Sequence, residues 1–86
     1  MDIGTVLQAL YDSEINARVF SFWDAGWTAE LGDDMNGILE SEDGLTDLKA
    51  VAEWLHNAAL RHFPNSVYAK RAARGSGAGR ADEVFG

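Results

Sequence analysis

The strongest structural signal in this sequence is a hairpin between residues 15 and 31. Residues 15–23 are rich in β-branched and aromatic side chains, and residues 27–31 alternate apolar with polar ones. Between them, Asp24-Ala25-Gly26 suits a three-residue loop with Gly26 in the left-handed conformation. The pattern therefore predicts two antiparallel strands joined by this loop.

The loop implies a register in which Trp23 lies opposite Trp27. Successive side chains of a strand point to opposite faces, so the register divides the hairpin into two sets. The set expected in the core is Ile15, Ala17, Val19, Trp23, Trp27, Ala29 and Leu31. The set expected on the other face is Asn16, Arg18, Phe20, Phe22, Thr28 and Glu30. A slip of one residue would turn one strand over.

The segments around the hairpin complete a small fold. Residues 32–37 have turn composition, ending in Asn-Gly, and residues 38–42 read as a short third strand whose acids suit an edge. Apolar spacing predicts a helix over residues 3–12 with Asp2 as its cap. A longer helix is expected over residues 47–63.

The long helix is expected to begin after Thr46 as its N-cap and to end before Pro64. Its predicted buried stripe is Leu48, Val51, Ala52, Leu55, Ala59 and Phe63, with Trp54 and Ala58 beside it. The centre of the core is expected where Leu48, Leu55 and Ala59 meet the pair Trp23 and Trp27. The predicted fold is therefore a single α+β domain in the order α-β-β-β-α, a three-stranded antiparallel meander packed by a long C-terminal helix.

Length and composition limit the chain to one domain. Of its 86 residues, residues 1–69 are predicted to fold and the glycine-rich, mildly basic residues 70–86 to form a flexible tail. There is no cysteine, no basic-then-apolar leader and no apolar run of membrane-spanning length. These features predict a cytoplasmic protein that does not enter a membrane.

No motif in the sequence carries recognisable chemistry. Aligning the acidic turn with a calcium loop places Gly32 where the first acidic ligand should stand. His56 and His62 are six residues apart, about 120° around a helix, so they do not face each other. The only serine between glycines lies in the predicted tail, where no base could be held beside it. We therefore expect no catalytic residues, no metal and no cofactor, and the chain is predicted not to be an enzyme.

Charge is distributed unevenly along the chain. The formal net charge is −7, and seven acids with no base occur from residue 30 to residue 47. This acidic rim consists of Glu30, Asp33, Asp34, Glu40, Glu42, Asp43 and Asp47. Such a body repels phosphate and attracts basic protein surfaces, so its folded part should not bind nucleic acid directly. A purely solubilising rim is the alternative.

Two aromatic side chains stand outside the predicted core. Phe20 and Phe22 share a sheet face with Arg18 and Thr28. One helix on each side of the sheet would bury them, whereas two helices on the same side would leave an aromatic patch rimmed by polar groups, as in protein-binding sites. Both arrangements are compatible with the sequence.

Several short motifs resemble a group of short alphaproteobacterial and phage proteins with no known activity. They are Ser13-Glu14-Ile15-Asn16-x-Arg18, Phe22-Trp23-Asp24-x-Gly26-Trp27, Leu31-Gly32-Asp33, Asn36-Gly37, Trp54-Leu55 and His62-Phe63-Pro64-x-Ser66. The resemblance covers roughly residues 8–70 and implies one compact α/β unit in a bacterial or phage cytoplasm.

These observations lead to two main functional hypotheses, and a small metal-dependent hydrolase built on the acidic loop is a third alternative. In the first, the chain is a non-catalytic acidic module that binds a basic protein surface, and it acts as an inhibitor if that surface normally holds nucleic acid. In the second, it is a structural or scaffold protein that forms a homodimer or larger homo-oligomer through the aromatic face.

Overall fold

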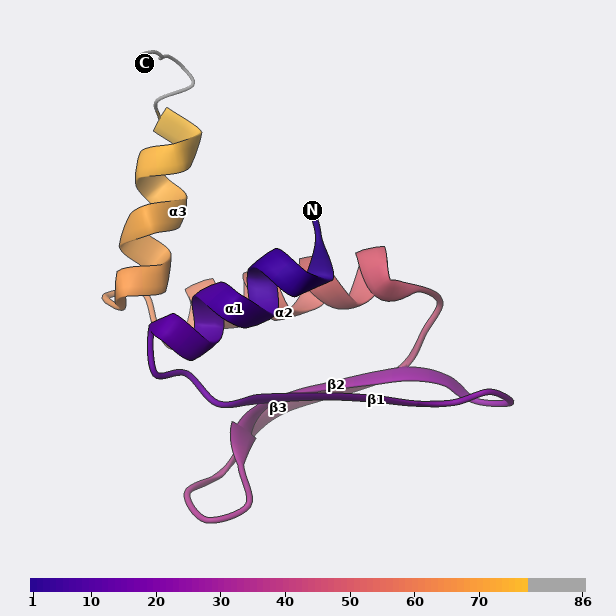
Figure 1. The fold of residues 1–86 in the computed structure, drawn as a ribbon. Helices are drawn as coiled ribbons and strands as arrows, with labels where there is room; N and C mark the ends of the chain where they lie inside the picture. The colour runs from indigo at the N-terminus through magenta and orange to yellow at the C-terminus, as the bar shows by residue number, and fades with distance from the viewer. Residues whose placement is uncertain (78–86) are drawn as a thin grey trace.

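The computed structural model describes residues 1–77, which form three helices and three strands. In chain order the elements are α1 (Ile3–Asp12), β1 (Ala17–Phe22), β2 (Gly26–Asp33), β3 (Gly37–Leu45), α2 (Leu48–His62) and α3 (Val67–Gly77). Figure 1 shows α1 and α2 lying together above the sheet, while α3 projects away from them. The predicted small α+β fold is confirmed, and the predicted order is extended by a third helix.

The three strands form one antiparallel sheet in the order β1-β2-β3. Phe22 lies opposite Gly26, so the predicted pairing of Trp23 with Trp27 is wrong by two residues. A shift of two residues preserves the alternation of side chains. The predicted division of the paired hairpin residues between two faces therefore stands.

Trp23 is the residue whose environment differs most from the prediction. It lies in the hairpin loop, which is closed by a 2.9 Å hydrogen bond from the Ala25 amide to the Phe22 carbonyl. Gly26 follows with a φ of 87°, the left-handed conformation predicted for it. Because Trp23 is 97% exposed, the predicted Trp23/Trp27 centre of the core is wrong, although Trp27 does pack against the core.

The core lies between the sheet and the two helices above it. Its buried members are Val6, Leu10, Ile15, Ala29, Leu31, Val51, Ala52, Leu55, Ala58, Ala59 and Tyr68. Helix α2 packs on β2 and β3, and α1 packs chiefly on α2. Leu48, which was expected at the core centre, is instead exposed because it lies in the first turn of α2, beyond the buried stripe.

The N-cap of α2 is Asp47 and not Thr46. The Asp47 side chain accepts a 2.8 Å hydrogen bond from the Ala50 amide, and its backbone is extended, as an N-cap requires. The corresponding prediction for α1 is confirmed, because the Asp2 carboxylate accepts from the Thr5 amide.

Helix α3 occupies part of the segment predicted to be a tail. Ser66 Oγ accepts a hydrogen bond from the Ala69 amide, and the Ser66 carbonyl accepts one from the Lys70 amide. With this first turn held, the alanines and basic residues that follow are good helix formers, and the helix continues to Gly77. Residues 78–86 of the predicted tail lie outside the described part of the chain.

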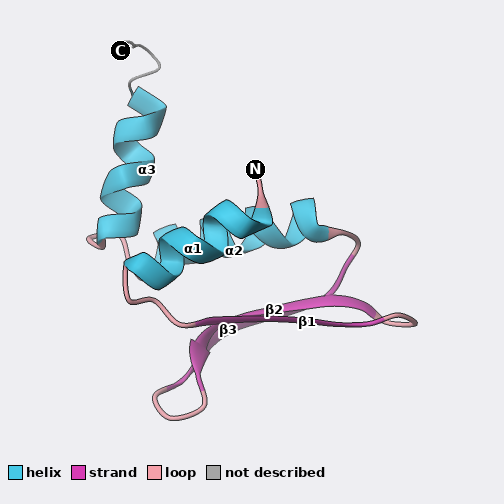
Figure 2. Ribbon diagram, viewed as in Figure 1, coloured by secondary structure: helices cyan, strands magenta, loops and turns pink. Residues whose placement is uncertain are grey.

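Helices α1 and α2 lie on the same side of the sheet. In Figure 2 no helix lies below the strands, and α3 leaves the end of α2 on the helical side. Within residues 1–77, the second face of the sheet is therefore uncovered.

Strand β3 runs to Leu45, beyond the predicted end at residue 42, and its pairing with β2 is interrupted by register shifts at two places.

Candidate functional site

The uncovered side of the sheet, called the open face below, is the surface most distinct from the rest of the fold. It is defined by Arg18, Phe20, Phe22, Thr28, Glu30, Ile38, Ser41 and Asp43, which alternate with the residues that face the helices. The four residues of the predicted aromatic face, Arg18, Phe20, Phe22 and Thr28, are brought together here. Of the two arrangements compatible with the sequence, the structure has the one with both helices on the same side.

Phe20 and Phe22 form the apolar part of the open face. Their rings meet edge to face, with centroids 5.9 Å apart and an interplanar angle of 82°. Phe20 is half-buried, whereas Phe22 is 62% exposed. Adjacent Trp23 at the hairpin tip is a third aromatic side chain and is almost fully exposed. Three neighbouring aromatics of this kind offer the type of area that protein interfaces bury.

Arg18 is held in place on the β1 side of this face. It lies opposite Glu30 in the register, and its Nη2 and Nε lie 2.6 and 2.8 Å from Glu30 Oε1. Its guanidinium carbon lies 5.9 Å from the centroid of the Phe20 ring. The hydrogen bond to Glu30 raises the pKa of Arg18 above its already high usual value. Arg18 therefore lies near the Phe20 ring and pairs with the charge of Glu30.

Thr28 is on the predicted aromatic face, but its side chain is largely covered by its neighbours. It is opposite Phe20 and only 9% exposed, and its hydroxyl donates a 3.1 Å hydrogen bond to Asp43 Oδ1. This contact spans the register shift near the C-terminal end of β3, where Gly44 takes a φ of 71°. Thr28 therefore supports the open face more than it presents a contact surface.

The acidic rim does not form one patch. Glu30 and Asp43 lie on the open face, and Asp34 lies in the adjoining turn, 3.5 Å from Arg18 Nη1. Asp47 caps α2. Glu42 lies opposite Ala29 on β3 and is exposed. The remaining two acids, Asp33 and Glu40, are used inside the fold.

Asp33 holds the turn between β2 and β3. Its Oδ1 accepts hydrogen bonds from the amides of Met35 and Asn36, and its Oδ2 accepts from the side chains of Asn16 and Asn36. These hydrogen bonds lower the pKa of Asp33, and the bond from the Asn36 amide has the largest effect. Its carboxylate is thus occupied by the turn itself.

Glu40 faces the helices and links β3 to the end of α2. Its two oxygens lie 2.9 and 2.8 Å from Arg61 Nη2, and Oε1 lies 2.9 Å from His62 Nε2. The hydrogen bond from Arg61, followed by that from His62, lowers the pKa of Glu40. Glu40 therefore has a structural role on the side away from the open face.

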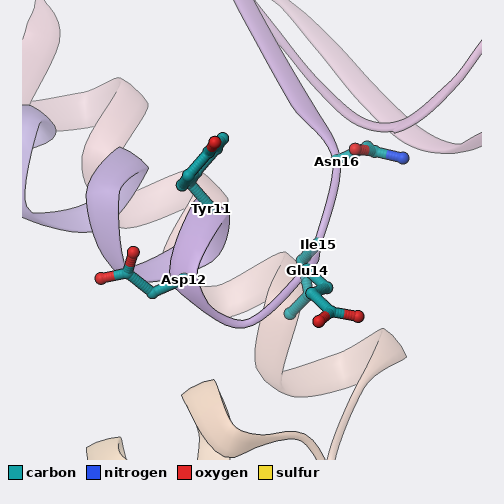
Figure 3. Close-up of a pocket in the computed structure, with 5 residues that line it drawn as sticks. All are labelled: Tyr11, Asp12, Glu14, Ile15 and Asn16. Atoms are coloured by element: carbon teal, nitrogen blue, oxygen red, sulfur yellow. The ribbon is translucent and has the colours of Figure 1, made fainter.

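Two hollows border α1, and neither gathers a set of groups typical of a catalytic site. One is a wide pocket of about 570 Å³ after α1, lined by Tyr11, Asp12, Glu14, Ile15 and Asn16. Figure 3 shows that the polar ends of these side chains point in different directions. A mostly apolar cleft of about 250 Å³ lies between α1, α2 and α3. Its wall includes His56, whose Nδ1 is hydrogen-bonded to Tyr68 Oη.

Among residues 1–77, no three His, Asp or Glu side chains are grouped so that they could hold a metal ion. In the same part of the chain, no helix combines the length and hydrophobicity needed to cross a lipid bilayer.

Comparison of the chain with known protein families, curated proteins and solved structures finds no match. The resemblance to short alphaproteobacterial and phage proteins therefore stays a prediction.

Sequence reasoning missed part of the open face. It did not place Ile38, Ser41 or Asp43 on the same face as Phe20 and Phe22, because the bulged pairing of β3 breaks the alternation from which faces are predicted. Gly44, which lies at the register shift nearer the end of β3, is the one sequence signal that could have indicated this bulged pairing.

Proposed function

We propose that this chain is a non-catalytic protein-binding module that meets a basic polypeptide surface with its open face. The observation that carries the proposal is the uncovered pair Phe20 and Phe22, flanked by Arg18 and bordered by acids. Burial of such aromatics supplies affinity, and the surrounding charges select the partner.

The charge of the molecule supports a basic partner. Near the aromatics, Arg18 is balanced by Glu30, which leaves Asp34 and Asp43 as net negative groups beside the patch. The formal net charge of −7 adds long-range attraction to positive surfaces. If the partner's basic surface normally holds nucleic acid, occupation by this chain would inhibit it.

The experiment compares capture of proteins by the tagged chain and by two variants. Phe22→Ser removes an exposed ring of the open face, and Leu48→Ser removes an exposed apolar side chain on the helical side as the matched control. We expect a partner that is retained by the wild type and the control and reduced at least tenfold by Phe22→Ser, which corresponds to about 1.4 kcal/mol. Equal retention by all three would contradict the proposal.

Salt dependence tests the chemistry of the partner. Raising salt to about 0.5 M screens exposed charges beyond a few ångströms and should weaken capture markedly. A partner held equally well at low and high salt would argue against a basic surface, even if Phe22 contributes to its binding.

The second hypothesis is a homo-oligomer in which two open faces stack on each other. The variant Phe22→Glu distinguishes it from binding to a different protein. Face-to-face stacking would bring the two Phe22 side chains together, so that the glutamate would abolish it. A chain that is monomeric before and after the substitution, measured by light scattering, excludes this arrangement.

A further inference from the structure

Strand β1 has a free edge. It is the first strand of the sheet and pairs with β2 on one side only. The Asn16 carbonyl accepts a hydrogen bond from the Gly32 amide, so by antiparallel alternation Arg18, Phe20 and Phe22 direct their backbone groups toward β2. The amides and carbonyls of Ala17, Val19 and Ser21 therefore point outward, and nothing in residues 1–77 pairs with them.

The two edges of the sheet differ in how they are protected. On β3, Glu40, Glu42 and Asp43 and two register shifts oppose pairing with another strand. Strand β1 has an unbroken register over six residue pairs, contains neither proline nor an acid, and carries a single charge on Arg18. An extended, regular, largely apolar edge of this kind is suited to pair with a further strand.

We propose that two copies of this chain pair through β1, antiparallel about a two-fold axis at Val19, to form one six-stranded sheet. In this register Val19 lies opposite Val19 of the second copy, and Ala17 lies opposite Ser21. These are the residues whose backbone groups point outward, so the two strands exchange a full set of hydrogen bonds without distortion.

The side chains suit the same register. Arg18 comes opposite Phe20 of the second copy on the open face, which repeats across the axis the contact that the two residues already make within one copy. No two like charges become directly opposed, because Arg18 is the only charged residue of the strand. The open faces of the two copies then become continuous, with the helices of both on the other side.

This inference does not rest on the proposed function, and its test is separate. The oligomeric state of the full chain is measured by light scattering at increasing concentration and moderate salt, where repulsion between acidic bodies is screened. We expect twice the chain mass at high concentration. A mass of one chain at about millimolar concentration would overturn the inference.

Hydrogen exchange identifies the surface that pairs. The amides of Ala17, Val19 and Ser21 should exchange at least tenfold more slowly as the concentration is raised, whereas the amides that already bond to β2 should change little. A dimer in which these three amides stay unprotected would also overturn the inference.

Two variants complete the test. Val19→Pro removes an outward amide that β2 does not use, so the folded chain should become monomeric. Phe22→Glu should leave edge pairing intact, because Phe22 comes opposite Asn16 at the end of the paired strands. If Val19→Pro fails to fold, the exchange of the three wild-type amides still decides the matter.

Discussion

The side chains of His56 on α2 and Tyr68 on α3 are joined by a hydrogen bond of 2.7 Å between Nδ1 and Oη. Their rings also meet edge to face, with centroids 5.6 Å apart. Tyr68 is buried, and this burial raises the pKa of its phenol. The pair anchors α3 to the rest of the fold, since α3 contacts few other elements.

Removal of this hydrogen bond should loosen α3. Tyr68→Phe leaves the ring but deprives the half-buried His56 of its partner, and we expect a loss of about 1 kcal/mol in the free energy of unfolding by urea. Tyr11→Phe, at a solvent-exposed tyrosine of α1, is the matched control and should change nothing measurable. Equal stability of the wild type and Tyr68→Phe would show that the bond does not hold α3.

The N-cap of α2 can be tested by two adjacent substitutions. Asp47→Ala removes the oxygen that accepts from the Ala50 amide and should cost about 1 kcal/mol of stability. Thr46→Ala removes the residue that the sequence favoured as the cap and should have little effect. If Thr46→Ala lowered the urea unfolding midpoint more than Asp47→Ala does, Thr46 and not Asp47 would be the cap.

The faces of the hairpin could be predicted from sequence although its register could not. Alternation depends only on whether a shift is even or odd, and the error was two residues, so Phe20 and Phe22 were assigned correctly to the face away from the core. The prediction for Trp23 was wrong because a tryptophan in an apolar run resembles a core residue, whether it ends a strand or begins a loop.

The positions of the helices relative to the sheet depend on long-range packing, which local patterns do not report. The sequence left open which face was covered. It also predicted no helix beginning at Val67, because the small and glycine-rich residues after Arg71 indicated a flexible segment. It also grouped seven acids that the fold separates, since Glu40 and Asp43 point to opposite sides of β3. Nearness in sequence did not translate into a common surface.

Gly32 is expected to be the least replaceable glycine of the sheet. Its φ is 112°, and a Cβ there would lie 2.5 Å from the Gly37 carbonyl oxygen and 2.9 Å from the Leu39 amide. Both neighbours are backbone atoms of the paired strand, so neither can move without breaking the pairing. Gly32→Ala should therefore cost more than the roughly 1–3 kcal/mol of backbone strain alone.

Gly37 provides the control for Gly32. It lies in the same turn region with a φ of 99°, but a Cβ there would meet nothing within 4 Å. Gly37→Ala should thus show the strain without the clash, at about 1–2 kcal/mol. Urea unfolding of the two variants separates the cost of backbone strain from the cost of the steric clash. If Gly32→Ala were no less stable than Gly37→Ala, the close approach of β2 and β3 at Gly32 would be contradicted.

Acid should destabilise the protein partly through Glu40, whose pKa is lowered from its usual 4.5 by Arg61 and His62. Above about pH 4.5 this carboxyl is ionised in both the folded and the unfolded chain, and its contribution to stability is fully present. As the pH falls below that value, the unfolded chain takes up a proton first. The contribution then declines and is lost once the pH has passed below the folded pKa.

Glu40→Gln removes this charge and tests the link between β3 and α2. We expect a lower urea midpoint than that of the wild type at pH 7, and a difference that shrinks as the pH is taken well below 4.5. Glu42→Gln, on the same strand but without a hydrogen-bond or ion-pair partner in residues 1–77, should follow the wild type throughout. A Glu40→Gln deficit that is the same at neutral and acidic pH would mean that lost packing, and not the ion pair, causes it.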